Sequence, residues 1–259
     1  MNELYQEVVT LPSLGLPYGE TLPGGQVTLE PFGVREEQLL QKPGSAARRQ
    51  LISTLLKCCV KDCPVDVDDF LIGDRLFLFM QIRRISLSDQ WTFDWVCEHC
   101  EERVRDQLLI SEATLCGPIA ERGEEDEEVE WVGEHEILLP LRKKTVHWRH
   151  LTGRDEKAAI NSAEQLRKKG LKPREGDPGY IYRMASALTR LDGEAVGFID
   201  AQNFVANLKA RDSLALRTSM EIHQIGYDFS SEKECPSCGW MNDVTMNFEL
   251  EEFFRPKQP

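Results

Sequence analysis

The alternation of apolar and polar residues along the chain predicts short strands and amphipathic helices in both halves. Several segments repeat apolar residues at helical spacing, and others alternate apolar with polar residues, as a strand with one buried face does. Strands are expected at 26–31, 91–96, 134–139, 144–149 and 244–248, and helices at 35–40, 45–59, 70–85, 154–169, 179–191, 201–209 and 213–224. Helices segregated from short strands are typical of an α+β fold, which we predict for this chain.

One helical motif occurs twice. Gly-Asp-Arg-Leu-Phe-Leu contains Asp74, and Arg-Asp-Ser-Leu-Ala-Leu contains Asp212, which lies 138 residues later (212 − 74 = 138). Each motif is followed at the same distance by a Cys-x-x-Cys pair, Cys97 with Cys100 and Cys235 with Cys238 (235 − 97 = 138). A repeated motif at a fixed offset predicts a unit that is built twice, so we expect two related halves.

The two halves are expected to differ by an insertion. Val27-Thr28-Leu29 resembles Val146-His147-Trp148 at an offset of 119 (146 − 27 = 119). The second half should therefore hold about nineteen additional residues, which we place near Gly170–Gly179.

Composition along the chain predicts the boundaries of these units. Residues 1–25 contain a Pro or Gly every few positions, which excludes a helix and predicts an extended N-terminal arm. Seven carboxylates fall between Glu121 and Glu130, as is typical of a solvated linker. We expect an arm at 1–25, a first repeat unit at 26–118, an acidic linker at 119–133 and a second repeat unit at 134–259.

The two Cys-x-x-Cys pairs predict a metal centre. A tetrahedral Zn²⁺ takes four thiolates, and each pair can supply two of them from a tight turn. We predict one structural zinc per chain, which joins the two halves, with the ligands Cys97, Cys100, Cys235 and Cys238. Gly239 is expected to adopt a positive φ in the second turn, and His99 to face solvent. Iron in place of zinc, two separate sites, unmetallated thiols, redox chemistry and local disulfides remain open alternatives.

The remaining cysteines and an aspartate cluster have simpler interpretations. Cys58, Cys59, Cys63 and Cys116 are expected to be buried free thiols, because a second metal site among them lacks an identifiable fourth ligand. The cluster at 66–69, with three aspartates, is expected to cap the helix that follows.

Charge and composition narrow the classes of function. The formal net charge is −13, which disfavours binding to a phosphate backbone. No apolar stretch is long enough for a membrane span, and the acidic N-terminus does not resemble a signal peptide, so we expect synthesis and retention in a reducing cytoplasm. The sequence contains no Gly-rich phosphate loop, nucleophile elbow or His-Glu-x-x-His motif, so we expect neither an enzyme nor a small-molecule substrate.

Several phrases together resemble the baseplate hub and hub-assembly proteins of T-even-type contractile-tailed phages. They are the Leu-Pro-Ser-x-Gly-Leu-Pro-Tyr segment, the later Arg-Glu-Glu, the Gly-Asp-Arg-Leu-Phe-Leu helix before a Cys-x-x-Cys, and the closing Cys-x-x-Cys-Gly with Phe-Phe-x-Pro. The resemblance implies a non-enzymatic component of a phage tail baseplate that is made in the host cytoplasm and contacts other tail proteins. We expect those contacts at Leu11–Tyr18 and at Phe253-Phe254, because both segments carry large apolar side chains.

Two other functions are weighed against this one. A zinc-ribbon regulator that binds nucleic acid would carry basic residues near its cysteines, whereas Glu232, Glu234 and Asp243 surround the second pair. A dithiol oxidoreductase would place its first thiol at the start of a helix, and neither pair here begins a helical pattern. A tail component is therefore the favoured interpretation.

Overall fold

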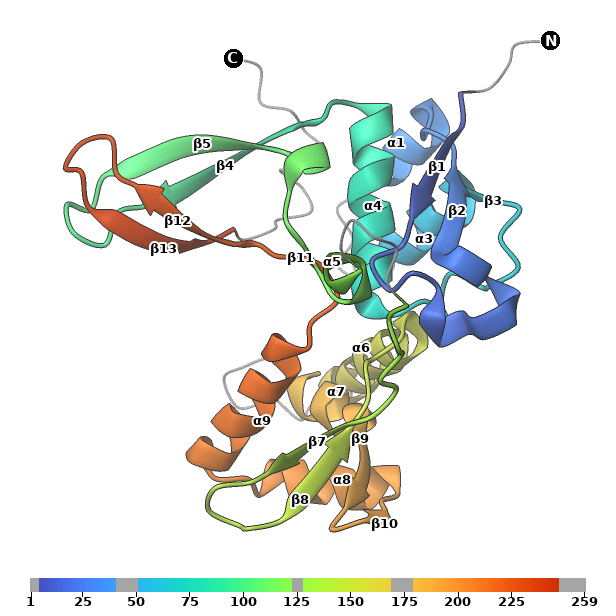
Figure 1. Cartoon of the computed structure of the whole chain (residues 1–259), viewed down its shortest axis with the longest axis vertical. Coiled ribbons are helices and arrows are strands. Elements are labelled where there is room, and N and C mark those ends of the chain that lie inside the picture. The colour runs from blue at the N-terminus through green and yellow to red at the C-terminus, as the bar shows by residue number, and fades with distance from the viewer. Residues whose placement is uncertain (1–4, 41–50, 123–127, 169–178, 247–259) are drawn as a thin grey trace.

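The structure is a computed structural model that describes residues 5–40, 51–122, 128–168 and 179–246. These residues form two lobes and an arm of two β-hairpins, which extends sideways from the first lobe (Figure 1). Helices and short antiparallel strands are both present, so the predicted α+β class is confirmed. The buried side chains form two separate clusters, one in the first lobe and the inner side of the arm and one in the second lobe.

The first lobe packs a three-stranded sheet against helices. Strands β1 (Glu7–Thr10), β2 (Gln26–Leu29) and β3 (Val60–Lys61) pair antiparallel in that order. Helices α1 (Val34–Leu40), α3 (Leu51–Cys59) and α4 (Ile72–Ser86) accompany the sheet. Helix α4 is enclosed on nearly all sides, with Leu78, Phe79, Met80 and Ile82 fully buried.

The N-terminal segment corrects one prediction. Residues expected to form an extended arm instead contribute β1 and two 3-10 turns, η1 (Leu16–Thr21) and η2 (Pro23–Gly25). Leu11, Leu14 and Leu22 are buried in the first lobe, because they supply apolar surface that its small sheet needs. The predicted contact role of Leu11 and Leu14 is therefore wrong. Phe253 and Phe254 lie outside the described residues.

The second lobe is built around a four-stranded antiparallel sheet. Its order is β10 (Glu194–Ala195), β9 (Leu188–Leu191), β8 (Thr145–Trp148) and β7 (His135–Leu138). The sheet is accompanied by helices α6 (Gly153–Lys168), α7 (Tyr180–Ala187), α8 (Phe198–Ala206) and α9 (Ala210–Ile222). The helix predicted at 179–191 ends early, because Asp192 and Gly193 adopt positive φ and form a two-residue hairpin turn that makes 188–191 a strand.

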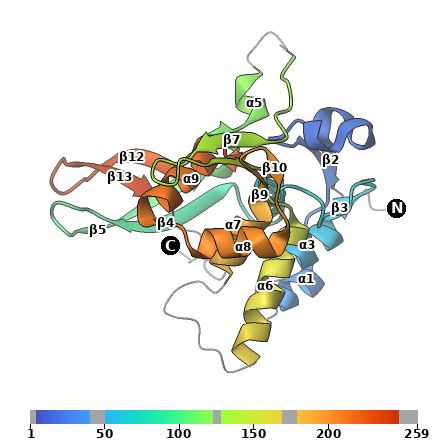
Figure 2. The same cartoon turned by 90° about the horizontal axis from the view of Figure 1, so that it is seen from below.

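The arm consists of two long hairpins whose inner faces meet. One pairs β4 (Gln90–Val96) with β5 (Arg103–Leu109), and the other pairs β12 (Ser230–Glu234) with β13 (Met241–Thr245). The hairpins lie side by side in both orthogonal views (Figures 1 and 2). Trp91, Phe93, Trp95 and Val244 are buried on the inner side. The segments η3 (Ile110–Glu112), β6 (Leu115–Cys116), α5 (Pro118–Glu121) and β11 (Gly226–Tyr227) connect the arm to the rest of the chain.

The lobes meet at the start of α4. The Ile72 amide donates to Leu151 O at 2.9 Å, and the Gly153 amide to Phe70 O at 3.0 Å. A Cβ at Gly73 would lie 1.9 Å from the Ile225 carbonyl oxygen, so only glycine permits this approach. Backbone contacts of this kind fix the orientation of the two lobes.

The aspartates at 66–69 correct another prediction. The residue before α4 is Leu71, and no side chain caps the helix. Asp68 is instead buried, where its carboxylate accepts hydrogen bonds from Ser53, Lys57 and Arg75. Burial alone would raise the pKa of Asp68, but the hydrogen bonds from Lys57 and Ser53 and the charges of Lys57 and Lys157 prevail and hold it well below its usual range.

Some pairs of elements are spaced by the same 138 residues as the cysteine pairs. Helix α4 begins at Ile72 and α9 at Ala210 (210 − 72 = 138). Strand β5 begins at Arg103 and β13 at Met241 (241 − 103 = 138), whereas β2 and β8 begin 119 residues apart (145 − 26 = 119). The insertion predicted near Gly170–Gly179 falls on 169–178, outside the described residues, except for Gly179.

Candidate metal centre

Each hairpin of the arm ends in a turn that carries one Cys-x-x-Cys pair, and the two turns have the same backbone pattern. In the first, the Cys97 amide donates to Glu102 O at 2.9 Å, and the Glu101 amide to Cys97 O at 3.0 Å. In the second, the Cys235 amide donates to Trp240 O at 2.9 Å, and the Gly239 amide to Cys235 O at 2.8 Å. The φ of Gly239 is 71°, as predicted, and Glu101 occupies the matching position with a φ of 59°.

The four thiols converge at the end of the arm. Their Sγ atoms all lie within 4.8 Å of one another. Cys97 Sγ lies 3.7 Å from Cys238 Sγ, and Cys100 Sγ lies 3.7 Å from Cys235 Sγ. In a tetrahedral site with metal–sulfur bonds of about 2.3 Å, neighbouring sulfurs stand about 3.8 Å apart. The cysteines are therefore spaced as four ligands of one metal ion and could bind one.

Polar contacts hold the two turns together. The buried Asn242 accepts from the Glu98 amide at 2.8 Å and donates to Trp240 O at 2.8 Å, so it links the first turn to the second. The imidazole of His99 stacks on Trp240 with ring centroids 5.0 Å apart. His99 is exposed, as predicted, and takes no place among the sulfurs. These contacts are of the kind that orient metal ligands from outside the coordination shell.

Ionisation is divided unevenly among the four thiols, since desolvation and hydrogen bonds with neighbouring thiols raise the pKa values of Cys100 and Cys238. Desolvation opposes ionisation of Cys97, but hydrogen bonds from the backbone amides of Cys100 and His99 prevail and lower the pKa of its thiol to about 6. Thiolates are the form that binds metal, so a thiol that ionises near neutral pH favours binding.

The remaining cysteines do not form a second cluster in the described part of the chain. Cys59 is buried as predicted, and burial is the main cause that raises the pKa of its thiol to about 12. Cys58, Cys63 and Cys116 are only partly buried. Among the described residues, the one group of metal-type ligands that comes together is the set at the end of the arm.

The structure also contains a histidine cluster that sequence reasoning did not find. His135 Nε2 and His150 Nε2 lie 3.1 Å apart, and the His135 ring stacks on Trp148 and packs against the tilted ring of His223, at centroid distances of 4.5 and 4.2 Å. No local motif joins these histidines, because they come from β7, from the segment after β8 and from the end of α9. Only the close succession of His147, Trp148 and His150 in one segment signalled a crowded aromatic region.

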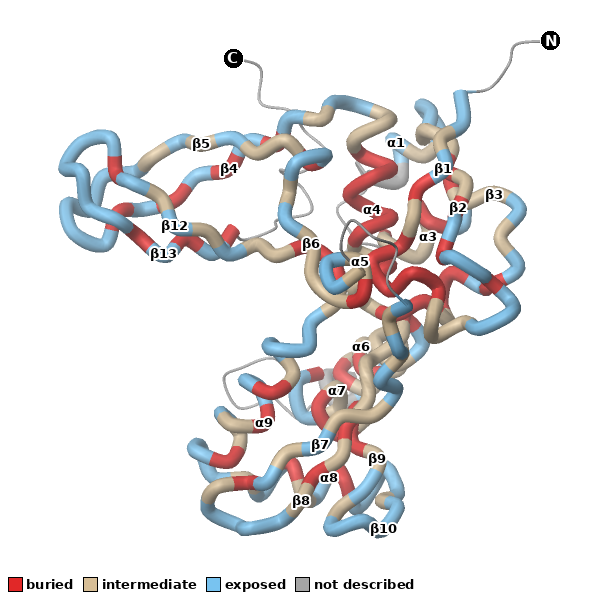
Figure 3. Tube along the Cα trace, in the orientation of Figure 1, coloured by how far each residue is buried: buried red, intermediate tan, exposed pale blue. Residues whose placement is uncertain are grey.

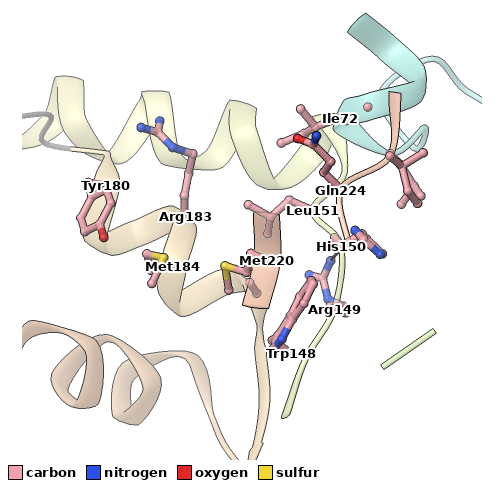
Figure 4. Close-up of a pocket in the computed structure, with 14 residues that line it drawn as sticks. Ile72, Trp148, Arg149, His150, Leu151, Tyr180, Arg183, Met184, Met220 and Gln224 are labelled. Carbon is pink, nitrogen blue, oxygen red and sulfur yellow. Dashed lines mark hydrogen bonds between the residues drawn. The ribbon is translucent and has the colours of Figure 1, made fainter. Parts of the chain in front are cut away.

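A cavity of about 310 Å³ lies beside this cluster, between the lobes. Met184 from α7 and Met220 from α9 lie next to each other in it, and Trp148, Leu151 and Ile72 line other parts (Figure 4). Its lining comes from both lobes, so it marks the junction between them.

Comparison with known proteins gives one match to a family model. Residues 16–130 match the model of the family described as T4 bacteriophage base plate protein. The resemblance to T4-like baseplate proteins is thereby confirmed. The match covers most of the first lobe, one hairpin of the arm and the segment that leads toward the second lobe, and it does not single out the hub. No curated protein and no solved structure matched the chain. A baseplate family suggests a structural role in the virion tail, with other tail proteins as partners.

None of the helices in the described residues has the length and apolar character required to cross a bilayer.

Proposed function

We propose that this protein is a non-enzymatic structural or assembly component of a contractile phage tail baseplate, in its hub region. The observation that carries the proposal is the family match over residues 16–130, and the phrases shared with hub and hub-assembly proteins direct it to the hub. The protein acts by binding other tail proteins.

In this proposal a structural Zn²⁺, one per chain, is held by Cys97, Cys100, Cys235 and Cys238. Sulfur separations of 3.7 Å support a closed tetrahedral site, as structural zinc prefers. One ligand pair precedes the second lobe in the chain and the other follows it. The metal therefore closes a loop that contains the whole second lobe, and it holds the two hairpins as one arm.

We further propose that the two halves arose by duplication of one unit. The shared offset of 138 residues for the helices, strands and cysteines supports this, as does the matching backbone pattern of the two turns. The proposed units remain 26–118 and 134–259, with the linker at 119–133 between them.

Charge and geometry argue against the two alternative functions, a nucleic-acid-binding regulator and a dithiol oxidoreductase. The arm residues 88–109 and 228–245 carry ten acidic and three basic side chains, a formal charge of −7, which would repel a nucleic acid. Neither Cys-x-x-Cys lies at a helix start, where a redox dithiol would be activated.

The proposal is tested by finding the protein in the particle. Quantitative mass spectrometry of purified virions, of tail assemblies and of host lysate should find it enriched with baseplate proteins. A protein confined to assembly intermediates would act as a chaperone, and one retained in virions would be a structural part. Absence from every tail fraction would contradict the baseplate assignment, and metal analysis of the same protein separately tests for one zinc per chain.

A further inference from the structure

Charge is distributed unevenly over this acidic protein. The arm residues 88–109 and 228–245 have a formal charge of −7, and a divalent cation held by four thiolates would add −2. The second lobe is different, because residues 131–168 and 179–227 carry thirteen basic and ten acidic side chains, a formal charge of +3. The molecule therefore has an acidic end and a basic end.

The acidic end also exposes large apolar side chains. Trp240 and Met241 are each about half exposed, at 52% and 53%, and Val96 is exposed at 59%. They lie at the end of the arm, where Trp240 stacks on His99. The exposed carboxylates around them are Glu98, Glu101, Glu102, Glu234 and Asp243. We call this surface the tip patch.

The basic end has the complementary character. The turn between β7 and β8 lies on the start of α9, because Asp212 accepts hydrogen bonds from the Leu141 and Arg142 amides at 2.7 and 3.2 Å. This contact brings Leu141 and Leu214, which are 50% and 55% exposed, to the same end of the lobe. The exposed basic residues there are Arg142, Lys143, Lys209 and Arg211. We call this surface the base patch.

The two patches are both accessible and point in different directions. The arm extends sideways from the first lobe, whereas the β7–β8 turn lies at the far end of the second lobe (Figure 1). Both regions are coloured as exposed in Figure 3. The tip patch and the base patch of one chain lie at separate ends of the molecule, so a contact between them requires two molecules.

We propose that copies of this chain associate through a contact in which the tip patch of one copy binds the base patch of another. Apolar side chains supply burial at the centre of this contact, and carboxylates opposite Lys and Arg side chains supply specificity and steering. A contact between two different surfaces is heterologous, so repetition produces either a closed ring or an open chain. The contact is expected in the isolated protein and does not require other baseplate components.

The test uses charge reversal on the full-length, metal-loaded protein. The tip variant is Glu102→Lys with Asp243→Lys, and the base variant is Lys143→Glu with Arg211→Glu. All four side chains are exposed, and a glutamate at residue 211 suits the first turn of α9. Glu112→Lys with Glu194→Lys is the control, because it changes net charge as much as the tip variant but lies outside both patches. Metal content is measured for each variant to exclude damage to the cysteine centre.

Sedimentation velocity at low and high salt gives the association constant. The wild type and control should self-associate, more weakly at high salt, and each single-patch variant should lose at least about tenfold in affinity, equivalent to about 1.4 kcal/mol. Mixing the tip and base variants should restore association, because each now presents the charge that the other needs. A wild type that stays monomeric at every concentration, or variants that associate as well as the control, would overturn the proposal. So would a base patch that binds a short DNA duplex while self-association is unchanged by either variant.

Discussion

Helices α4 and α9 begin alike and end in very different surroundings. Both carry an aspartate in the first turn, Asp74 and Asp212, and each aspartate is fully buried and binds backbone amides of a loop that follows an edge strand. Helix α4 is then enclosed by α3, β11 and η3, and its start is covered by the second lobe. The start of α9 is covered by the β7–β8 turn and contacted by Tyr180, whose hydroxyl lies 3.5 Å from Ser213 Oγ, and Leu214 and Ile222 remain exposed.

The difference shows what the surroundings of a helix require of its sequence. At Phe79 and Met80, α4 has fully buried apolar side chains, whereas the positions 138 residues later in α9 are the exposed Arg217 and Thr218. Leu78 and Leu216 correspond in the same way and are both fully buried. The two leucines belong to the buried clusters of their lobes, whereas the positions that differ are buried in α4 and exposed in α9. The exposed face of α9 is thus free for a partner in a way that α4 is not.

Removal of the metal is expected to have the largest effect on folding. It tests whether the two Cys-x-x-Cys pairs bind one shared ion. Cys97→Ser and Cys235→Ser each remove one of four proposed ligands, one from each pair. Structural zinc contributes roughly 10–16 kcal/mol to the folding of small peptides. We expect both variants to lose the metal and to lose hydrogen-exchange protection in 90–109 and 230–245 to the same extent.

The lobes should stay folded in these variants, because the four cysteines lie at the end of the arm and most of each buried cluster lies elsewhere. Cys58→Ser is the matched control and should keep one metal ion per chain. Full metal content in either ligand variant, or protection lost from one hairpin only, would show that the pairs do not share a centre.

The two aspartates should differ in their contribution to stability. Asp74 accepts the Ser13 amide at 3.1 Å and the Tyr18 hydroxyl at 2.6 Å inside the first lobe. Asp74→Ala leaves both donors buried without this partner, at an expected cost of about 3 kcal/mol. Asp212→Ala should cost about half as much, since Leu141 and Arg142 are exposed and water can reach their amides. Urea denaturation of both variants measures the difference, and equal costs would contradict the account of the two helix starts.

The histidine cluster predicts that acid affects the second lobe more than the first. Burial, together with the nearby His135 and His223, lowers the pKa of His150 to about 4, and burial also lowers the pKa of His135. A lowered histidine pKa means that the folded state disfavours the proton. The contribution of the neutral histidines to the free energy of unfolding is therefore complete above the unfolded pKa of about 6.5 and is lost as pH falls toward 4.

The expected loss over this interval is at most about 3 kcal/mol for His150. Hydrogen exchange at pH 7 and pH 4.5 should show weakened protection in β7, β8 and the end of α9, and His150→Gln should reduce that dependence on pH. Glu121 and Glu130 line the neighbouring cavity and would stabilise a protonated histidine, so they moderate the effect. Equal acid sensitivity in the core of the first lobe would count against the cluster as the cause.

Local sequence patterns predicted much of this structure. Periodicity placed α4 and α9 near their observed positions, and Cys-x-x-Cys spacing identified the four residues that converge, because both signals are contained in a few neighbouring residues. Gly239 was predicted to take a positive φ for the same reason.

Features that depend on distant residues could not be predicted in this way. The Pro- and Gly-rich N-terminal segment correctly excluded a helix, but only the first-lobe core shows that Leu11 and Leu14 are buried. The position of Asp68 before a helix predicted a cap, but its carboxylate binds Arg75 and Lys57, and the sequence does not show that these side chains come together. His135 and His223 are 88 residues apart in sequence (223 − 135 = 88), and no local signal brings them together.

The smallest expected effect is that of Leu214→Ala, and it sharpens the comparison between the helices. In α4, Leu78→Ala removes a fully buried side chain and should cost about 2–5 kcal/mol, because it loses apolar burial and leaves a cavity. Leu214 is 55% exposed in α9, so its replacement should change the free energy of unfolding by less than about 0.5 kcal/mol in the monomer. The same substitution should still weaken self-association, since Leu214 lies in the base patch. Urea denaturation of dilute protein and sedimentation of concentrated protein separate the two effects. A large loss of monomer stability would mean that the side chain is covered within its own chain, and an unchanged association constant would mean that this face of α9 does not take part in the contact.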